Sequence, residues 1–140
     1  GTADFLARIN DELIEKLGLQ DDVVMHEGFV ADEDVRYYFS AADSLLLPYR
    51  TATQSGVTQI CYNFCTPVIV TDVGGLKEIV PDGRVGYVCT PSAEGVHEAL
   101  EKMYSGDNIA RFAEAMQEER KRFTWRAMCD KIEELYSQIE

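Results

Sequence analysis

The run Pro67-Val68-Ile69-Val70-Thr71 constrains the fold more than any other segment of the chain. It is continuous, apolar and rich in β-branched residues, which is typical of a strand covered on both faces. Strands of that kind belong to parallel sheets whose two faces are packed with helices. The segment therefore favours an α/β fold.

Three further short apolar runs are predicted to be strands, at residues 23–26, 44–48 and 85–89. Apolar spacing and helix-start signals predict helices around them. These are expected at residues 5–17, 31–42, 56–64, 76–80, from 92 to about 103, and from 108 to 139 with an interruption near 123–124. Strands that alternate with helices form βαβ units, so about four strands are expected to lie in one parallel sheet flanked by helices.

Composition excludes several function classes. The chain has 140 residues, of which 46% are hydrophobic and 27% charged, as in a soluble globular domain. Thirteen Lys and Arg against 25 Asp and Glu give a net charge of −12, which repels nucleic-acid backbones. No apolar run approaches the roughly 20 residues of a membrane span, and no secretion signal is seen. Neither a nucleic-acid partner nor a transmembrane segment is predicted.

The four cysteines, at positions 61, 65, 89 and 129, do not predict a metal site. They form no C-x-x-C pair, and the chain has only two histidines, His26 and His97. A zinc site needs about four ligands at tighter spacing. We interpret the cysteines as small apolar residues of a reduced core, which places the protein in the cytoplasm.

A ligand is expected at the carboxyl ends of the predicted strands, because open α/β sheets bind ligands in the crevice beyond those ends. The loops to consider are 27–34, 48–56, 71–76 and 89–94. The loop 48–56 is the strongest candidate, because helix N-termini bind phosphate and this loop directly precedes a predicted helix. Its candidate residues are Thr51, Thr53, Gln54, Ser55 and Gly56. An ordinary Ser/Thr N-cap has the same pattern, and that alternative stays open.

Gly74 and Gly75 form a second candidate site. They follow a predicted strand and precede Glu78 on a short helix, so a ligand could approach the backbone there with Glu78 pointing into the same crevice. A tight strand-to-helix connection explains the two glycines equally well. The segment is not a G-x-G-x-x-G fingerprint, so no nicotinamide cofactor is predicted. No nucleophile paired with a base is evident, and the catalytic residues remain unknown.

Five segments stand out for their order and spacing. They are GFV (28–30), YFSAAD (38–43), LLPY (46–49), TPVIVTDVGGLKEIV (66–80) and DGRVGYV (82–88). Together they resemble the C-terminal half of a retaining glycosyltransferase of family 4, or group 1, over roughly residues 5–137. The resemblance implies the GT-B architecture, two Rossmann-like domains facing across a cleft. The expected fold is thus a partial Rossmann-like sheet.

The resemblance also implies a nucleotide-sugar donor, whose diphosphate is held by backbone N–H groups of a loop that matches Thr53 to Gly56 here. The family carries two glutamates at this place, the first for the donor sugar and the second for the ribose. The second falls on Ile60, or on Gln59 if one residue is inserted. Gln59 can still hydrogen-bond a ribose diol, so we prefer the insertion. The first glutamate then falls on Thr51, which is not an acid.

By the same resemblance, residues 1–140 form one truncated C-terminal domain. The family's N-terminal acceptor domain, and a first β/α unit bearing an Arg and a Lys, have no match in the chain. The implied reaction is transfer of a hexose to a saccharide or lipid-linked acceptor, without a metal or further cofactor. The chain alone is expected to be inactive. Peripheral attachment to the inner face of the membrane is an alternative to a purely cytoplasmic location.

A second function class remains open beside the enzyme. The absent glutamate and the absent basic pair also suit a non-catalytic interaction domain, or relic, with a glycosyltransferase-like fold. Its exposed sheet edge would favour a homo-oligomer, because unpaired edge strands promote association.

Overall fold

The computed structural model describes residues 10–26, 28–51, 56–123 and 125–139. It divides into two units, Gly1–Asp34 and Val35–Glu140, each with its own internal contacts. In the first unit, residues 10–16 are helical. This helix ends as predicted at Gly18, where φ is +68° and the amide of Leu19 donates to the oxygen of Ile14 at 3.0 Å.

The strand predicted at residues 23–26 is wrong, because these residues form no β-ladder. Val24 is 78% exposed, and its apolar neighbours Val23 and Met25 are also exposed. A strand exists only where a neighbouring strand accepts and donates its backbone hydrogen bonds. No strand among the described residues pairs with this run, so its apolar character alone did not make it a strand.

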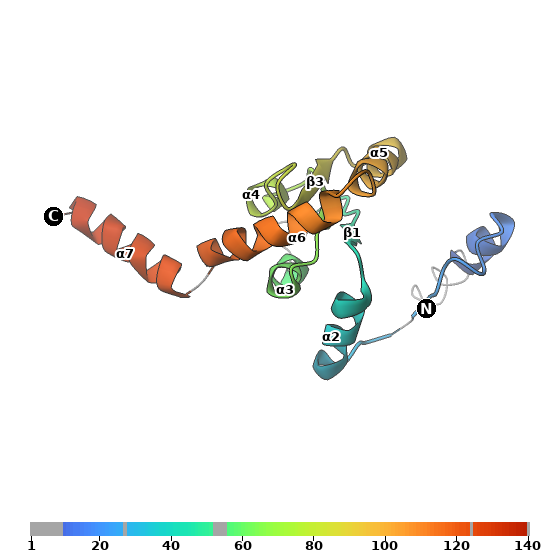
Figure 1. The fold of residues 1–140 in the computed structure, drawn as a ribbon, viewed down its shortest axis with the longest axis horizontal. Helices are drawn as coiled ribbons and strands as arrows, with labels where there is room; N and C mark the ends of the chain where they lie inside the picture. Colours follow the sequence, from blue (N-terminus) through green and yellow to red (C-terminus); the bar gives the residue numbers. More distant parts are fainter. Residues whose placement is uncertain (1–9, 27, 52–55, 124, 140) are drawn as a thin grey trace. The chain divides into compact units, whose positions relative to one another are not determined.

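The remaining elements follow the sequence prediction closely (Figure 1). In chain order they are α2 (Asp32–Ala41), β1 (Leu45–Leu47), α3 (Gly56–Phe64), β2 (Val68–Thr71), α4 (Leu76–Ile79), β3 (Gly86–Cys89), α5 (Ala93–Met103), α6 (Asn108–Glu119), the 3-10 helix η1 (Arg120–Phe123) and α7 (Trp125–Ile139). The interruption expected near residues 123–124 is present as η1.

The strands form a parallel sheet in the order β1-β2-β3, with β1 and β3 at its edges. In register, Leu47 lies opposite Val70, and Val70 lies opposite Val88. The described residues thus contain three strands of the expected kind, not four. Because all three run in the same direction, their carboxyl ends meet at one edge of the sheet.

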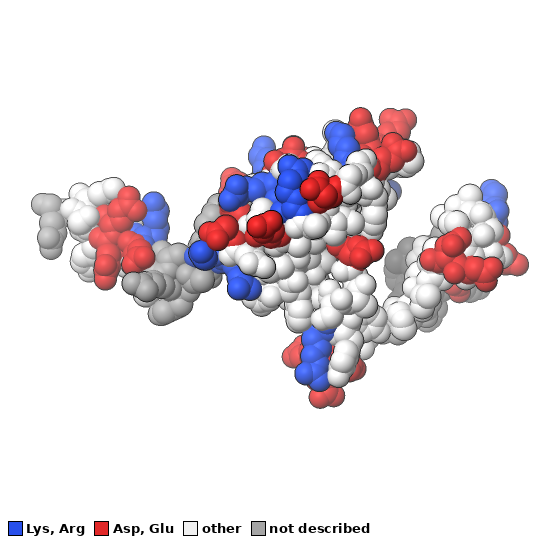
Figure 2. Space-filling view, in the orientation of Figure 1, with Lys and Arg blue, Asp and Glu red and all other residues white. Residues whose placement is uncertain are grey.

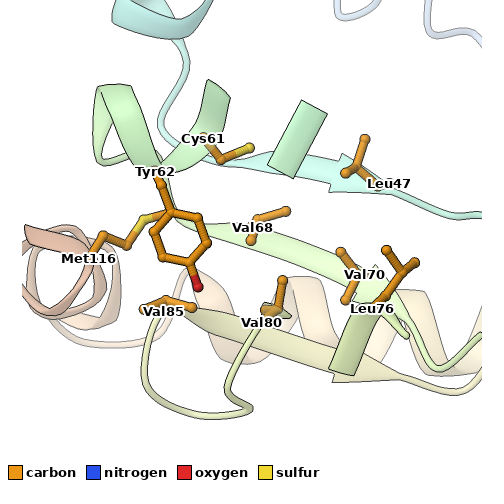
Figure 3. Close-up of a cluster of buried hydrophobic side chains, with 9 residues drawn as sticks. All are labelled: Leu47, Cys61, Tyr62, Val68, Val70, Leu76, Val80, Val85 and Met116. Atoms are coloured by element: carbon orange, nitrogen blue, oxygen red, sulfur yellow. The ribbon is translucent and has the colours of Figure 1, made fainter. Parts of the chain in front are cut away.

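Strand β2 is buried on both faces, as its β-branched sequence predicts. On one face, Val68 and Val70 pack with side chains of α3, α4 and α6. Figure 3 shows this cluster, which consists of Leu47, Cys61, Tyr62, Val68, Val70, Leu76, Val80, Val85 and Met116. The hydroxyl of Tyr62 crosses it and donates to the backbone oxygen of Ile79 at 2.5 Å, which ties α3 to α4.

The opposite face of β2 packs against α5 and α6. Ile69 lies there in a second buried cluster with Ala99, Met103 and Phe112. Tyr87 of β3 meets the Phe112 ring edge-on, with 5.2 Å between the ring centroids. The sheet is therefore a middle layer between helices, and the side chains that remain accessible at its carboxyl edge are those of the loops.

Candidate functional site

A crevice of about 330 Å³ lies beyond the carboxyl ends of the three strands. Its lining residues are Pro48, Tyr49, Arg50, Thr71, Pro91, Ser92, Ala93 and Val96. They come from three of the four loops that the sequence singles out, 48–56, 71–76 and 89–94, and from the start of α5. The predicted location of the crevice is confirmed for loops 48–56 and 89–94, whereas the one lining residue from 71–76 is Thr71, the last residue of β2. The fourth loop, 27–34, belongs to the other unit.

Hydrogen bonds hold the strand ends together beneath this crevice. Thr71, which is 2% exposed, donates its hydroxyl to the backbone oxygen of Tyr49 at 2.5 Å. The amide of Asp72 donates to the oxygen of Cys89 at 2.8 Å. The first bond joins the end of β2 to the segment after β1, and the second joins it to the end of β3. The crevice wall is thus fixed by the sheet itself.

The other wall is the first turn of α5. Ser92 is its N-cap, as the sequence predicts, and its hydroxyl accepts from the amide of Gly95 at 3.1 Å. Thr90 lies 3.1 Å from the same hydroxyl, oxygen to oxygen. The Ser92 side chain is therefore already engaged in holding the helix start, and it shapes the crevice without needing a ligand.

The crevice differs in charge from the rest of the chain. Acidic side chains are prominent on the face shown in Figure 2, with basic ones among them. Among the described residues that line the crevice there is no Asp or Glu, and Arg50 carries the one charge. Asp72, just beyond Thr71, has its carboxylate 4.0 Å from the ammonium of Lys77. An anion would meet less repulsion here than over most of an acidic chain.

The predicted diphosphate loop is described only at its ends. Thr53, Gln54 and Ser55 lie outside the described residues. Thr51 is exposed, and Gly56 is the first residue of α3, also exposed. Gln59 lies one turn further along α3 and is exposed as well, so its amide can be reached by a ligand. None of the described members lines the crevice, and their binding roles stay predictions.

The two glycines after β2 form the connection to α4. Gly74 has a φ of +56°, a conformation that favours glycine, and Gly75 is the residue before the helix. The amide of Glu78 donates to the oxygen of Gly75 at 3.2 Å, and the Glu78 side chain is exposed. The tight-turn explanation of this pair is therefore confirmed, while ligand contact at Gly74, Gly75 and Glu78 stays a prediction.

Neither of two cysteines near the sheet is an activated nucleophile. Burial raises the pKa of the Cys61 thiol to about 12 and also raises the pKa of Cys89. In the described ranges, no three His, Cys, Asp or Glu side chains come together as a metal site would require. The helices described there include none with the length and apolarity needed to cross a membrane.

Comparison with known proteins identifies the family. A family model described as "Glycosyl transferases group 1" matches residues 6–106, well over half of the chain. The chain belongs to the group 1 glycosyltransferases. The D-inositol 3-phosphate glycosyltransferase of Paenarthrobacter aurescens (strain TC1) is 34% identical over 97 residues, which is 65% of this chain and 22% of that protein.

Two solved structures share the fold of this group 1 chain. Sucrose-phosphate synthase (tll1590) from Thermosynechococcus elongatus matches 94% of the chain at a TM-score of 0.76 and 26% identity. Anabaena Alr3699/HepE, solved in complex with UDP-glucose, matches 99% at a TM-score of 0.70 and 25% identity. The chain spans 34% and 38% of those two chains, respectively. The match confirms a partial Rossmann-like fold of the GT-B kind.

Sequence reasoning about this glycosyltransferase chain missed part of the crevice. It named loop 89–94 but assigned no binding role to Pro91, Ser92 or Ala93, which line the crevice beside Thr71. The available signal was Ser92 itself. A residue that caps a helix directly after a strand must lie at the carboxyl edge of the sheet, where the crevice forms.

Proposed function

We propose that this chain provides the nucleotide-sugar-binding part of a retaining glycosyltransferase that transfers a hexose to a saccharide or lipid-linked acceptor. The likeness to a structure solved with UDP-glucose, which extends over 99% of the chain, is the observation that carries the proposal. The crevice supports it, because it lies where open α/β sheets bind nucleotides and its lining carries no described carboxylate.

Each candidate residue has a role in this proposal. Backbone N–H groups of Gln54, Ser55 and Gly56 hold the diphosphate at the start of α3. Gln59 binds the ribose, and Thr51 stands where the family places an acid for the donor sugar. In a separate loop, Gly74 and Gly75 let the ligand approach the backbone, with Glu78 as a support behind them.

In the proposed reaction, negative charge develops on the leaving diphosphate. When the bond between the sugar carbon and the diphosphate oxygen breaks, its electron pair stays on the leaving diphosphate. Catalysis also requires both substrates to be oriented and water to be excluded, which one wall of a cleft does not achieve. We therefore propose that residues 1–140 bind donor but do not transfer it without an acceptor-binding domain, and that no cofactor besides the donor takes part.

The proposed location is the cytoplasm. Four free cysteines fit a reducing compartment. Fractionation of source cells, followed by detection with an antibody against residues 1–140, tests this placement and any peripheral attachment. Recovery from the soluble cytoplasmic fraction is expected, and release from membranes only by high salt would show peripheral attachment instead.

Calorimetric titration of the chain with UDP-glucose, GDP-mannose and ADP-glucose tests donor binding, with NAD as the control dinucleotide. Saturable binding of one sugar nucleotide, and not of NAD, is expected. Binding of none would favour the interaction-domain alternative. Sedimentation of the same sample reports whether the chain forms a homo-oligomer. Incubation of the bound donor with saccharide acceptors should yield no product from the chain alone.

A further inference from the structure

We propose that Arg50 is the cation of this crevice and binds a phosphate group of the substrate, an inference that rests on the proposed function. Its ligand chemistry is a phosphate or diphosphate ester. The proposal gives the donor site a positive charge, carried by a side chain that lines the crevice.

Arg50 stands at an anchored point of the crevice. It follows Tyr49, whose backbone oxygen accepts the hydroxyl hydrogen of the buried Thr71 at 2.5 Å. Its own side chain lines the crevice and is exposed, so a solute can reach the guanidinium. The backbone before Arg50 is thus held by the sheet, while the side chain remains free to meet a ligand.

Charge makes this position unusual in the molecule. The chain carries a net charge of −12, so an anion is repelled by most of its surface. Within the described part of the crevice wall, Arg50 is the one charged side chain. No ion pair of the described residues involves Arg50, whereas the nearby Lys77 lies 4.0 Å from the carboxylate of Asp72. The guanidinium charge is therefore available to a ligand.

The side-chain chemistry favours a phosphate over other anions. A guanidinium offers N–H donors in a fixed planar fork that matches two phosphate oxygens at once. The crevice volume of about 330 Å³ is at the lower end of ligand pockets, enough for part of a sugar nucleotide. The phosphate can come from the donor's diphosphate or from a phosphorylated second substrate, and both present the same oxygens to Arg50.

Titration of the full chain with UDP, GDP and ADP selects the nucleotide that binds most tightly. That diphosphate, its monophosphate and its nucleoside are then titrated against wild type, Arg50→Gln and Arg50→Lys at two salt concentrations. Arg111→Gln is the matched control, because Arg111 is an exposed arginine of α6 outside the crevice and its loss changes the net charge equally. Circular dichroism verifies the fold of each variant.

Arg50→Gln should weaken diphosphate binding about tenfold or more, with a smaller loss for the monophosphate and less than a twofold change for the nucleoside. Arg50→Lys should lie between Arg50→Gln and wild type, and Arg111→Gln should match wild type. Added salt should weaken diphosphate binding by wild type more than by Arg50→Gln. These wild-type salt data and Arg50→Lys test the proposal even if Arg50→Gln does not fold.

Inorganic phosphate distinguishes the two sources. Competition with the diphosphate assigns Arg50 to the donor. Phosphate that binds together with the diphosphate, and is lost in Arg50→Gln, assigns it to a second substrate. Equal diphosphate and phosphate affinities in wild type and Arg50→Gln would overturn the inference while leaving the proposed function intact. Wild type that binds no nucleoside diphosphate would overturn both.

Discussion

Thr71 and Tyr49 are joined by a side-chain to backbone hydrogen bond of 2.5 Å that spans the carboxyl ends of two neighbouring strands. Thr71 is the last residue of β2, and Tyr49 follows β1 by two positions. Both line the crevice, and Arg50 comes next in the chain. The bond therefore connects the buried sheet to the loop that carries Arg50, the residue that we propose binds phosphate.

Thr71→Val keeps the shape of this side chain but removes its hydroxyl. We expect a loss of about 1 kcal/mol in unfolding free energy, because a buried hydrogen bond contributes about that much. We also expect weaker nucleotide binding, since the loop before Arg50 loses its anchor. Urea denaturation and calorimetric titration measure the two effects. Thr71→Ser keeps the hydroxyl and should retain nucleotide affinity; equal affinity in both variants would show that the bond does not position the loop.

Two substitutions at Ser92 separate the effect of helix capping on stability from the effect of crevice charge on diphosphate binding. Ser92→Ala should lower the unfolding free energy by about 1 kcal/mol, because the amide of Gly95 loses its acceptor. Ser92→Asp should keep the cap and the stability, since Asp is an equally good N-cap. It also adds a carboxylate to the crevice wall and should weaken diphosphate binding severalfold. Unchanged binding by Ser92→Asp would place the phosphate elsewhere.

Two helices of this chain end with the same hydrogen-bond pattern but different residues. After residues 10–16, Gly18 takes a φ of +68°; after α3, Cys65 takes a φ of +51°. At the second site the amide of Cys65 donates to Tyr62, and that of Thr66 donates to Cys61. This is a Schellman motif, in which glycine is the favoured residue. Cys65 therefore holds a left-handed conformation that costs a side chain about 1 kcal/mol.

Cys65→Gly should raise the unfolding free energy by about 0.5–1 kcal/mol, because glycine takes this φ without steric cost. Thermal denaturation followed by circular dichroism measures the change. Asn63→Gly is the control, since position 63 is exposed inside α3 and glycine there should lower stability by a few tenths of a kcal/mol. Destabilisation by Cys65→Gly would mean that the packing of the half-buried thiol outweighs the backbone cost.

Most of the fold could be predicted from the sequence where local and tertiary signals agree. The run Val68-Ile69-Val70 is apolar on both faces and became a strand buried on both faces. The hydroxyl of Ser92 caps the start of a helix, and Gly18, which has no side chain, ends one. Neither signal depends on what packs around the helix. Such signals depend on a few neighbouring residues, and the sequence contains them in full.

The parts of the fold and of the site that could not be predicted depend on contacts with other segments, whose positions the sequence does not show. Val23 and Val24 are as apolar as β2, yet without a neighbouring strand in the described chain they form no strand and are exposed. Ser92 indicates a helix start at the carboxyl edge of the sheet, but the contribution of Ala93 and Val96 to the crevice wall depends on how α5 packs against the sheet. Arg50, by contrast, lies within residues 48–56, the loop that the sequence already indicates as the strongest candidate for ligand binding.

Cys61 should make stability fall at alkaline pH. In the folded chain, burial raises its thiol pKa from 9.0 to about 12. Above pH 9.0 the unfolded chain loses this proton and the folded chain keeps it, so the unfolded state binds fewer protons and unfolding becomes easier as pH rises toward 12. The loss is at most about 1.4 kcal/mol per pH unit.

Urea denaturation of wild type and Cys61→Ala at pH 8, 9, 10 and 10.5 should show a shallower decline for the variant, although a core cavity lowers its stability at every pH. Cys129→Ala, on α7, controls for the loss of a thiol outside the core. Parallel declines in wild type and Cys61→Ala would show that the buried thiol is not linked to folding in this way.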